Sequence, residues 1–219
     1  IKKINEIQKK NKKPILVGGT GLYFKSLTEG LVKIPNIPLK KRNEIRMLQK
    51  KLGQKNFYKK LVKLDPLIKD YLNPNDAQRA IRAYEIKKFT KVSMINWFKN
   101  TKKFFKKDDF IKIYIDFPRQ ELIERIVKRT KKMINDGAIS EVRRFTKLNI
   151  KKDNIAFKII GIQEILKFLR HESSLREVKD QISIKTRQYA KRQITWARGQ
   201  MADWQKIQPQ DLKLVLKKF

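Results

Sequence analysis

The sequence contains no cysteine and only one histidine, His171, among its 219 residues. Without cysteine the chain forms no disulfides and no thiolate metal sites, and such a composition is compatible with a reducing cytoplasm. A single histidine argues against zinc sites built from several histidines and against a Ser-His-Asp triad. No apolar run approaches the roughly 20 residues that a membrane span needs. We therefore expect a cytoplasmic protein with no membrane association.

Acidic residues are also scarce, with 21 Asp and Glu against 55 Lys and Arg, which gives a formal net charge of +34. So large an excess of one sign opposes compaction and favours a polyanionic partner. The lysines are spread along the whole chain, as in a general composition bias, so the charge alone is a modest signal. The apolar fraction of 40% supports a hydrophobic core in one sizeable domain or in a core with a subdomain.

The most informative stretch is the basic run 185–196, KTRQYAKRQITW. Helical spacing places Arg187, Lys191 and Arg198 in one narrow sector, which suits a phosphate backbone. A second, mostly apolar sector suits a core and contains Ile182, Thr186, Tyr189, Gln193, Trp196 and Ala197. The pattern predicts a helix over 180–199 that faces nucleic acid, with Tyr189 and Trp196 in the core rather than on an RNA-stacking surface.

Strand, glycine turn and helix follow one another near the start of the chain. Residues 15–17 read as a short buried strand, 18–21 as a G-G-T-G turn and 22–31 as a helix. Open α/β sheets bind ligands at the carboxyl ends of their strands, and glycines let the backbone approach a ligand closely. A tight turn capped by threonine is the alternative. A second strand is predicted at 111–117. The two strands indicate an α/β core over 1–36 and 108–219, interrupted by a mostly helical insertion over 37–107. Within the insertion, Asp76 is predicted to cap a helix.

A long amphipathic helix is predicted from about Arg119 to Asp136, closed by Gly137. Its apolar stripe comprises Leu122, Ile123, Ile126, Val127, Thr130, Met133 and Ile134. Arg129 borders this stripe, and a cation there either faces a partner or ligand, because an unpaired buried charge is costly, or extends to solvent. Spacing alone leaves both alternatives open.

These pieces, in this order, resemble the transfer-RNA dimethylallyltransferases of the bacterial type. The matching segments are 15–23, 74–83 with its Pro-Asn-Asp and Gln-Arg, the helix from Arg119 to Val142, the Ile160-Gly161 turn and 186–198. The resemblance implies a P-loop NTPase-like, three-layer α/β core. It also implies transfer of a dimethylallyl group from dimethylallyl diphosphate to N6 of adenosine 37, beside the anticodon of tRNA. The implied partners are the anticodon stem-loop, dimethylallyl diphosphate and Mg²⁺, whose ligands are not in this chain, and the implied state is a monomer.

Site residues follow from the same resemblance, position by position. Arg129 resembles the family arginine that contacts the diphosphate, and Thr20 the threonine that faces the target nucleotide. Arg79 and Arg82 have ordinary helix-surface charge as their alternative reading. The candidates for contact with tRNA are Arg42, Gln78, Arg79, Arg82, Lys158, Gly161, Gln163, Arg187, Lys191, Arg192, Gln193, Trp196 and Arg198.

The sequence departs from the family pattern at its beginning. The family's P-loop, which holds the diphosphate, and the following aspartate, which receives the adenine N6, have no counterpart here, and the chain starts at Ile1. We therefore expect part of the protein to be absent and this chain alone to be inactive. A decayed remnant that only binds tRNA is an alternative. A small-molecule kinase half is a third, which the basic helix disfavours. In a smaller departure, Lys91 stands where the family commonly has glycine.

Overall fold

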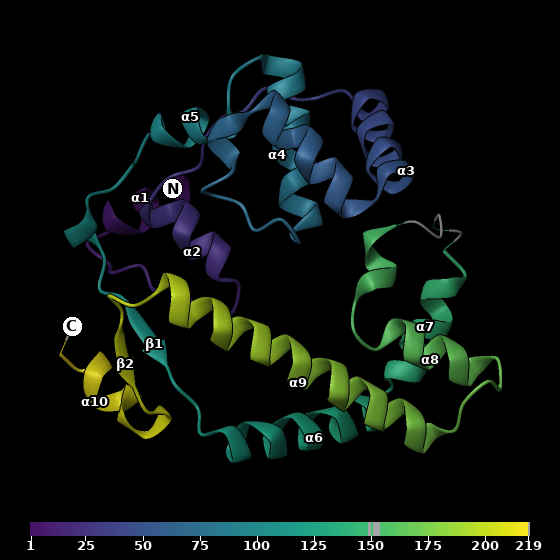
Figure 1. Cartoon of the computed structure of the whole chain (residues 1–219). Coiled ribbons are helices and arrows are strands. Elements are labelled where there is room, and N and C mark those ends of the chain that lie inside the picture. The colour runs from purple at the N-terminus through teal and green to yellow at the C-terminus, as the bar shows by residue number, and fades with distance from the viewer. Residues whose placement is uncertain (149, 151–153, 219) are drawn as a thin grey trace. The chain divides into compact units, whose positions relative to one another are not determined.

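The structure, a computed structural model, describes residues 1–148, 150 and 154–218 (Figure 1). The chain forms two compact units. Unit 1 comprises Ile1–Ile15 and Leu22–Phe110, and unit 2 comprises Leu16–Gly21 and Ile111–Phe219. The predicted domain boundaries, with 37–107 as an insertion, stay a prediction, because compactness does not show which segment is inserted into which.

Unit 1 is helical in the part of the chain that the structure describes. Its core is dense, and Phe57, Leu61 and Ile68 have no exposed surface. Helical geometry is interrupted at Gly53, whose φ of 71° and ψ of 163° glycine adopts without steric cost. The helix or helix pair predicted over 39–63 is therefore a pair of helical segments joined by a kink, which together carry the label α3 (Leu39–Leu64). Its elements are α1 (Lys2–Gln8), α2 (Gly21–Thr28, of which Gly21 belongs to unit 2), α3 (Leu39–Leu64), η1 (Pro66–Ile68), α4 (Ala77–Thr90), α5 (Met94–Lys99) and η2 (Lys107–Asp109).

Both ends of α4 have a clear local cause. The Asp76 carboxylate accepts a hydrogen bond of 3.0 Å from the backbone N–H of Arg79, which confirms the predicted cap. At the other end Lys91 adopts the left-handed conformation, with φ 62°, and its N–H donates to the carbonyl of Lys87. This conformation is strained for a residue with a Cβ atom, so glycine is the residue that suits this position best.

Unit 2 combines a small parallel sheet with helices. Strand β1 (Ile113–Ile115) pairs with β2 (Gln205–Ile207), with Ile113 opposite Gln205. Helices α6 and α9 run side by side in opposite directions, one leaving β1 and the other leading to β2 (Figure 1). The remaining elements complete the set: α6 (Arg119–Asn135), α7 (Ala138–Thr146), η3 (Ile155–Lys158), α8 (Ile162–Leu169), α9 (Leu175–Gln200), η4 (Pro209–Asp211) and α10 (Leu212–Leu216).

The apolar stripe of α6 is narrower than the sequence predicts. Ile126, Thr130 and Ile134 are buried, but Val127 is 38% exposed. Ile134 joins a core with Ile165, Val178 and Ile182 from α8 and α9. Helical spacing overestimates the stripe because the neighbouring helices cover only part of the α6 surface.

The strand predicted at 15–17 is wrong. Ile15 is 73% and Val17 91% exposed, and neither residue has strand hydrogen bonding. Within the described part of the chain, β1 and β2 pair only with each other. A three-residue apolar segment becomes a strand only when a neighbouring strand accepts and donates its backbone hydrogen bonds.

Candidate functional site

The glycine turn of unit 2 rests directly on α9. The side-chain Nε2 of Gln193 donates a hydrogen bond of 2.6 Å to the carbonyl of Gly19. Gly21 lies so close to the ring of Trp196 that an added Cβ atom would collide with it. Thr20 lies between these two contacts and is exposed. Glycine is therefore required at position 21 by close approach, and two residues of the basic helix fix the place of the predicted threonine.

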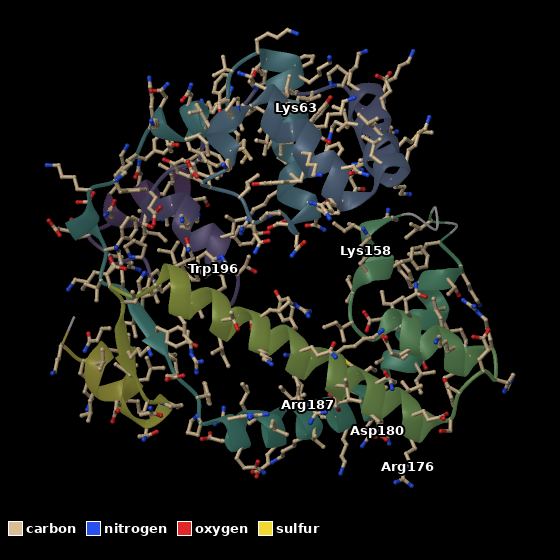
Figure 2. The ribbon with its side chains drawn as sticks, viewed as in Figure 1. Lys63, Lys158, Arg176, Asp180, Arg187 and Trp196 are labelled. Carbon is tan, nitrogen blue, oxygen red and sulfur yellow. The ribbon has the colours of Figure 1, made fainter. Side chains whose placement is uncertain are left out.

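The middle of α9 carries an open groove of about 440 Å³. Figure 2 labels Arg187 and Trp196 on this helix. Three predicted tRNA-contact residues, Lys191, Arg192 and Trp196, line the groove together with Gln188 and Thr195. Arg187 is exposed on the same helix. Arg187, Lys191 and Arg192 are therefore all accessible in the middle of α9, beside the glycine turn.

Tyr189 does not lie in the core, contrary to the prediction. It is 43% exposed, and the guanidinium of Arg192 lies 5.8 Å from the centre of its ring. Trp196 is half-buried. Among the residues of α9, burial is confined to Val178, Ile182 and Ala197. Neighbouring elements thus cover the two ends of the helix and leave its middle open, which helical spacing alone does not reveal.

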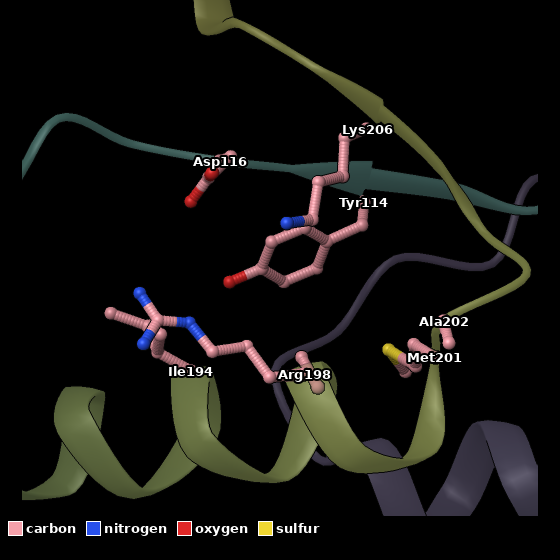
Figure 3. A pocket seen from close by; sticks show the side chains of 8 residues that line it. Tyr114, Asp116, Ile194, Arg198, Met201, Ala202 and Lys206 are labelled. Carbon is pink, nitrogen blue, oxygen red and sulfur yellow. The ribbon is translucent and has the colours of Figure 1, made fainter.

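Arg198 lines a different cavity, of about 260 Å³, between the C-terminal part of α9 and the sheet. Figure 3 shows Tyr114 reaching from β1 towards Arg198, with Asp116 and Lys206 beside it. Burial first, and then the Asp116 carboxylate, raise the pKa of the Tyr114 phenol, while the Arg198 cation opposes this shift. Arg198 therefore lines this cavity, whereas Lys191, in the same helical sector, lines the groove. The remaining residues of the cavity are Ile194, Ala197, Met201 and Ala202.

A buried carboxylate links the predicted Gly161 turn to α9. Glu164 is 6% exposed, accepts a hydrogen bond of 2.8 Å from the backbone N–H of Gly161 and forms an ion pair with Lys185. Burial raises the pKa of the Glu164 carboxyl, but the hydrogen bonds from Lys185 and the backbone outweigh it, and the pKa lies below its usual value. The neighbouring candidates Lys158 and Gln163 are exposed, and Gln163 donates to the carbonyl of Phe157.

Arg129 is exposed on α6. In the described part of the chain it has no ion pair, whereas its neighbour Arg125 pairs with Glu121 at 3.0 Å and lies 4.7 Å from the ring centre of Phe117. Arg129 is therefore not a buried charge, and its guanidinium is accessible to an anion. Its contact with a ligand stays a prediction.

Two of the unit 1 candidates, Arg42 and Arg82, meet at one buried carboxylate. Glu85 on α4 is 1% exposed, and its Oε2 lies 3.3 Å from a guanidinium nitrogen of Arg82 and 3.7 Å from Nε of Arg42 on α3. Arg79 is exposed and pairs with Asp76 at 3.4 Å, and Gln78 is exposed as well. The structure thus brings Arg42 and Arg82 together, although 40 residues separate them in the sequence.

Sequence reasoning missed the carboxylates that organise both groups, Glu85 and Glu164. A signal existed for Glu85, since it follows Arg82 at the i,i+3 spacing of helical ion pairs. None existed for the pairing of Glu164 with Lys185, because that contact depends on the packing of α8 against α9. No group of three or more potential ligands for a metal ion occurs within the described residues. In the same part of the chain no helix is long and apolar enough to cross a membrane.

Residues 1–200 match the family model described as IPP transferase. The chain is 59% identical over 219 residues to a tRNA dimethylallyltransferase of Pelagibacter ubique, covering all of this chain and 70% of that protein. It is 40% identical over 202 residues to a tRNA dimethylallyltransferase of Rickettsia massiliae, covering 92% of this chain and 56% of that protein. The chain thus spans 70% of the length of the first of these relatives and 56% of the length of the second.

Solved structures agree with the sequence matches. A eukaryotic dimethylallyltransferase acting on tRNA aligns with a TM-score of 0.74 and 26% identity over 97% of this chain and 55% of its own. A tRNA isopentenylpyrophosphate transferase from Bacillus halodurans aligns with a TM-score of 0.58 and 29% identity over 94% of this chain and 63% of its own. These likenesses, with the parallel pairing of β1 and β2, confirm the predicted α/β class. The chain belongs to the IPP transferase family, whose members include the tRNA dimethylallyltransferases.

Proposed function

We propose that the protein carrying this chain transfers a dimethylallyl group from dimethylallyl diphosphate to N6 of adenosine 37, beside the anticodon of tRNA. The observation that carries the proposal is the open cationic groove of α9 next to the glycine turn, in a chain 59% identical to a tRNA dimethylallyltransferase. Arginine and lysine suit RNA phosphates, and an exposed tyrosine beside them suits an unstacked base.

The reaction breaks the bond between the first carbon of the dimethylallyl group and a diphosphate oxygen. A new bond forms from that carbon to N6 of the adenine, and N6 releases a proton. The leaving diphosphate gains negative charge, so a cation beside it lowers the barrier. Arg129 meets this need because its guanidinium is exposed and has no ion pair in the described part of the chain. Thr20 supplies a hydroxyl close to Gln193 and Trp196, the α9 residues that contact the turn.

The test measures incorporation of labelled dimethylallyl groups into an anticodon stem-loop by the protein that carries this sequence. Arg129→Ala should lower turnover by about 100-fold, because removal of one group that stabilises developing charge costs about that much. RNA affinity should change by less than about twofold. Lys128→Ala is the matched control, since Lys128 is an exposed cation on the same helix. A large affinity loss with normal turnover would place Arg129 on the RNA instead.

The second candidate function, tRNA binding without chemistry, has the same cationic groove as its support. The assay separates the two, because a protein that only binds tRNA would retain the stem-loop and incorporate no label. Mg²⁺ beside the diphosphate, a monomeric state and a cytoplasmic location belong to the proposal. The described residues contain no group of three or more side chains that could hold this metal ion.

A further inference from the structure

Glu85 stands out in unit 1 because a nearly fully buried carboxylate meets two arginines from different helices. Its side chain is 2% exposed, and a single oxygen, Oε2, faces both Arg82 of α4 and Arg42 of α3. Burial of a carboxylate is costly unless cations or hydrogen bonds compensate for it. Here two positive charges face one negative charge, so the charge of the carboxylate is more than neutralised.

The two arginines are only partly used by this contact. Their side chains are 37% exposed at Arg42 and 42% exposed at Arg82. Each guanidinium carries five N–H donors, and the contacts to Glu85 involve one nitrogen of each. The remaining donors are available to an anion on the outer side, and the group of three side chains retains a net charge of +1.

One donor of the group lacks a hydrogen bond. Nε of Arg42 is buried and has no hydrogen-bond partner within the described residues, and its distance of 3.7 Å to Oε2 is too long for one. A buried donor left unpaired is costly, so Glu85 alone does not satisfy the guanidinium of Arg42.

We propose that Glu85 is a positioning residue that holds Arg42 and Arg82 as one clamp for a backbone phosphate of the RNA substrate. The carboxylate fixes the two guanidinium groups from the inside, and the phosphate binds their outer donors, a geometry that suits the planar fork of arginine. Arg79, exposed one helical turn before Arg82, extends the same cationic row. The inference rests on the proposed function, because it takes tRNA as the anion.

The test compares two variants that change the net charge equally. Glu85→Gln removes the carboxylate inside the clamp, and Glu44→Gln removes one that is 50% exposed on α3 beside Lys41. If charge alone decided binding, both variants would bind the anticodon stem-loop slightly more tightly than the unmodified chain. Positioning predicts the opposite for Glu85→Gln, a loss of roughly tenfold, as for a charge-assisted hydrogen bond. Glu44→Gln should stay within about twofold of the unmodified chain.

Salt dependence separates positioning from a loss of folded protein. A clamp without its anchor loses a phosphate contact, so the slope of log affinity against log salt should shrink by about 0.7 to 0.9. A variant that is merely less folded would keep the slope. Equal or tighter binding by Glu85→Gln overturns the positioning role and leaves the proposed function intact. Failure of the unmodified chain to bind the stem-loop overturns both.

A second set of variants covers the case in which Glu85→Gln does not fold. These variants leave Glu85 in place and change only the partly exposed arginines: Arg42→Gln, Arg82→Gln and the double variant. Two arginines that act as one clamp lose most of the contact when either is removed, so the double variant should bind little worse than each single one. Fully additive losses would overturn the clamp, since additivity is expected of independent sites.

Discussion

Among the residues that the structure describes, each unit contains one buried glutamate, and the two are held in different ways. Glu85 in unit 1 meets only side-chain cations within the described residues, and both arginines reach solvent. Glu164 in unit 2 accepts the backbone N–H of Gly161, at the start of α8, and pairs with Lys185 of α9. The first carboxylate therefore orients side chains, whereas the second fixes a backbone turn and joins two helices.

The difference teaches where each charge acts. A carboxylate that binds a backbone N–H at a helix start is part of the fold, because without it the N–H is left unpaired. Loss of a carboxylate that contacts only solvent-reaching arginines costs less folding stability, because their charges hydrate when it is removed. We therefore expect loss of Glu164 to affect stability and loss of Glu85 to affect binding.

The largest expected effect comes from removing the two carboxylates in turn. Glu164→Ala should lower the free energy of unfolding by about 2–3 kcal/mol, since hydrogen bonds to a charged group contribute about that much. Glu85→Gln should lower it by less, about 1 kcal/mol, because the two arginines left behind are more than a third exposed and hydrate. Denaturant titration of both variants measures the two losses. Equal losses would remove the distinction between the two sites.

The next effect concerns one residue with a positive φ in each unit, Gly161 next to Glu164 and Lys91 at the end of the helix that carries Glu85. Gly161 has φ 107°, and a side chain there is strained whatever the space around it. Gly161→Ala should therefore cost about 1–2 kcal/mol of stability. Lys91→Gly in unit 1 is the reciprocal change, because Lys91 has φ 62°, and it should stabilise by about 0.5 kcal/mol, the relief of strain less the added flexibility of the unfolded chain. Thermal unfolding of both variants checks the opposite signs.

The smallest effect is a dependence on pH. The pKa of Glu164 lies below its usual value in the folded chain, because hydrogen bonds from Lys185 and the backbone outweigh the effect of burial. Its stabilising contribution is therefore fully present above the unfolded pKa of about 4.3, and it is lost as the pH falls through the lower folded-state pKa. Glu164→Gln should show a flatter loss of stability below pH 4 than the unmodified chain. Parallel pH curves for the two proteins would contradict this expectation.

Long periodic helices were the most predictable part of the fold. The helices expected at 119–136 and 180–199 correspond to α6 and α9, and the cap at Asp76 is present. Helical periodicity and capping are local, so the sequence carries them in full. The strand at 15–17 was not predictable, because a strand exists only through a partner elsewhere in the chain.

The candidate site divides in the same way. The sequence identified the cations of α9 that line the groove. It also predicted that Tyr189 lies in the core, whereas in the structure Tyr189 is 43% exposed. Helical periodicity shows on which face of a helix a residue lies, but it does not show how much of that face the neighbouring elements cover. The roles predicted for Arg129, Thr20 and the tRNA-contact residues stay predictions, although their accessibility is now known.

The sequence by itself determined the family, the basic character of α9 and the positions of the long helices, because composition, order of motifs and periodicity are properties of the chain alone. Only the tertiary structure decided that Gln193 binds the carbonyl of Gly19, 174 positions earlier in the chain, and that Trp196 packs against the same glycine turn. It also decided that Arg42 and Arg82 share Glu85. Such contacts depend on which surfaces meet when helices pack. A charge or an aromatic ring is therefore legible in the sequence, whereas its partner becomes known only from the fold.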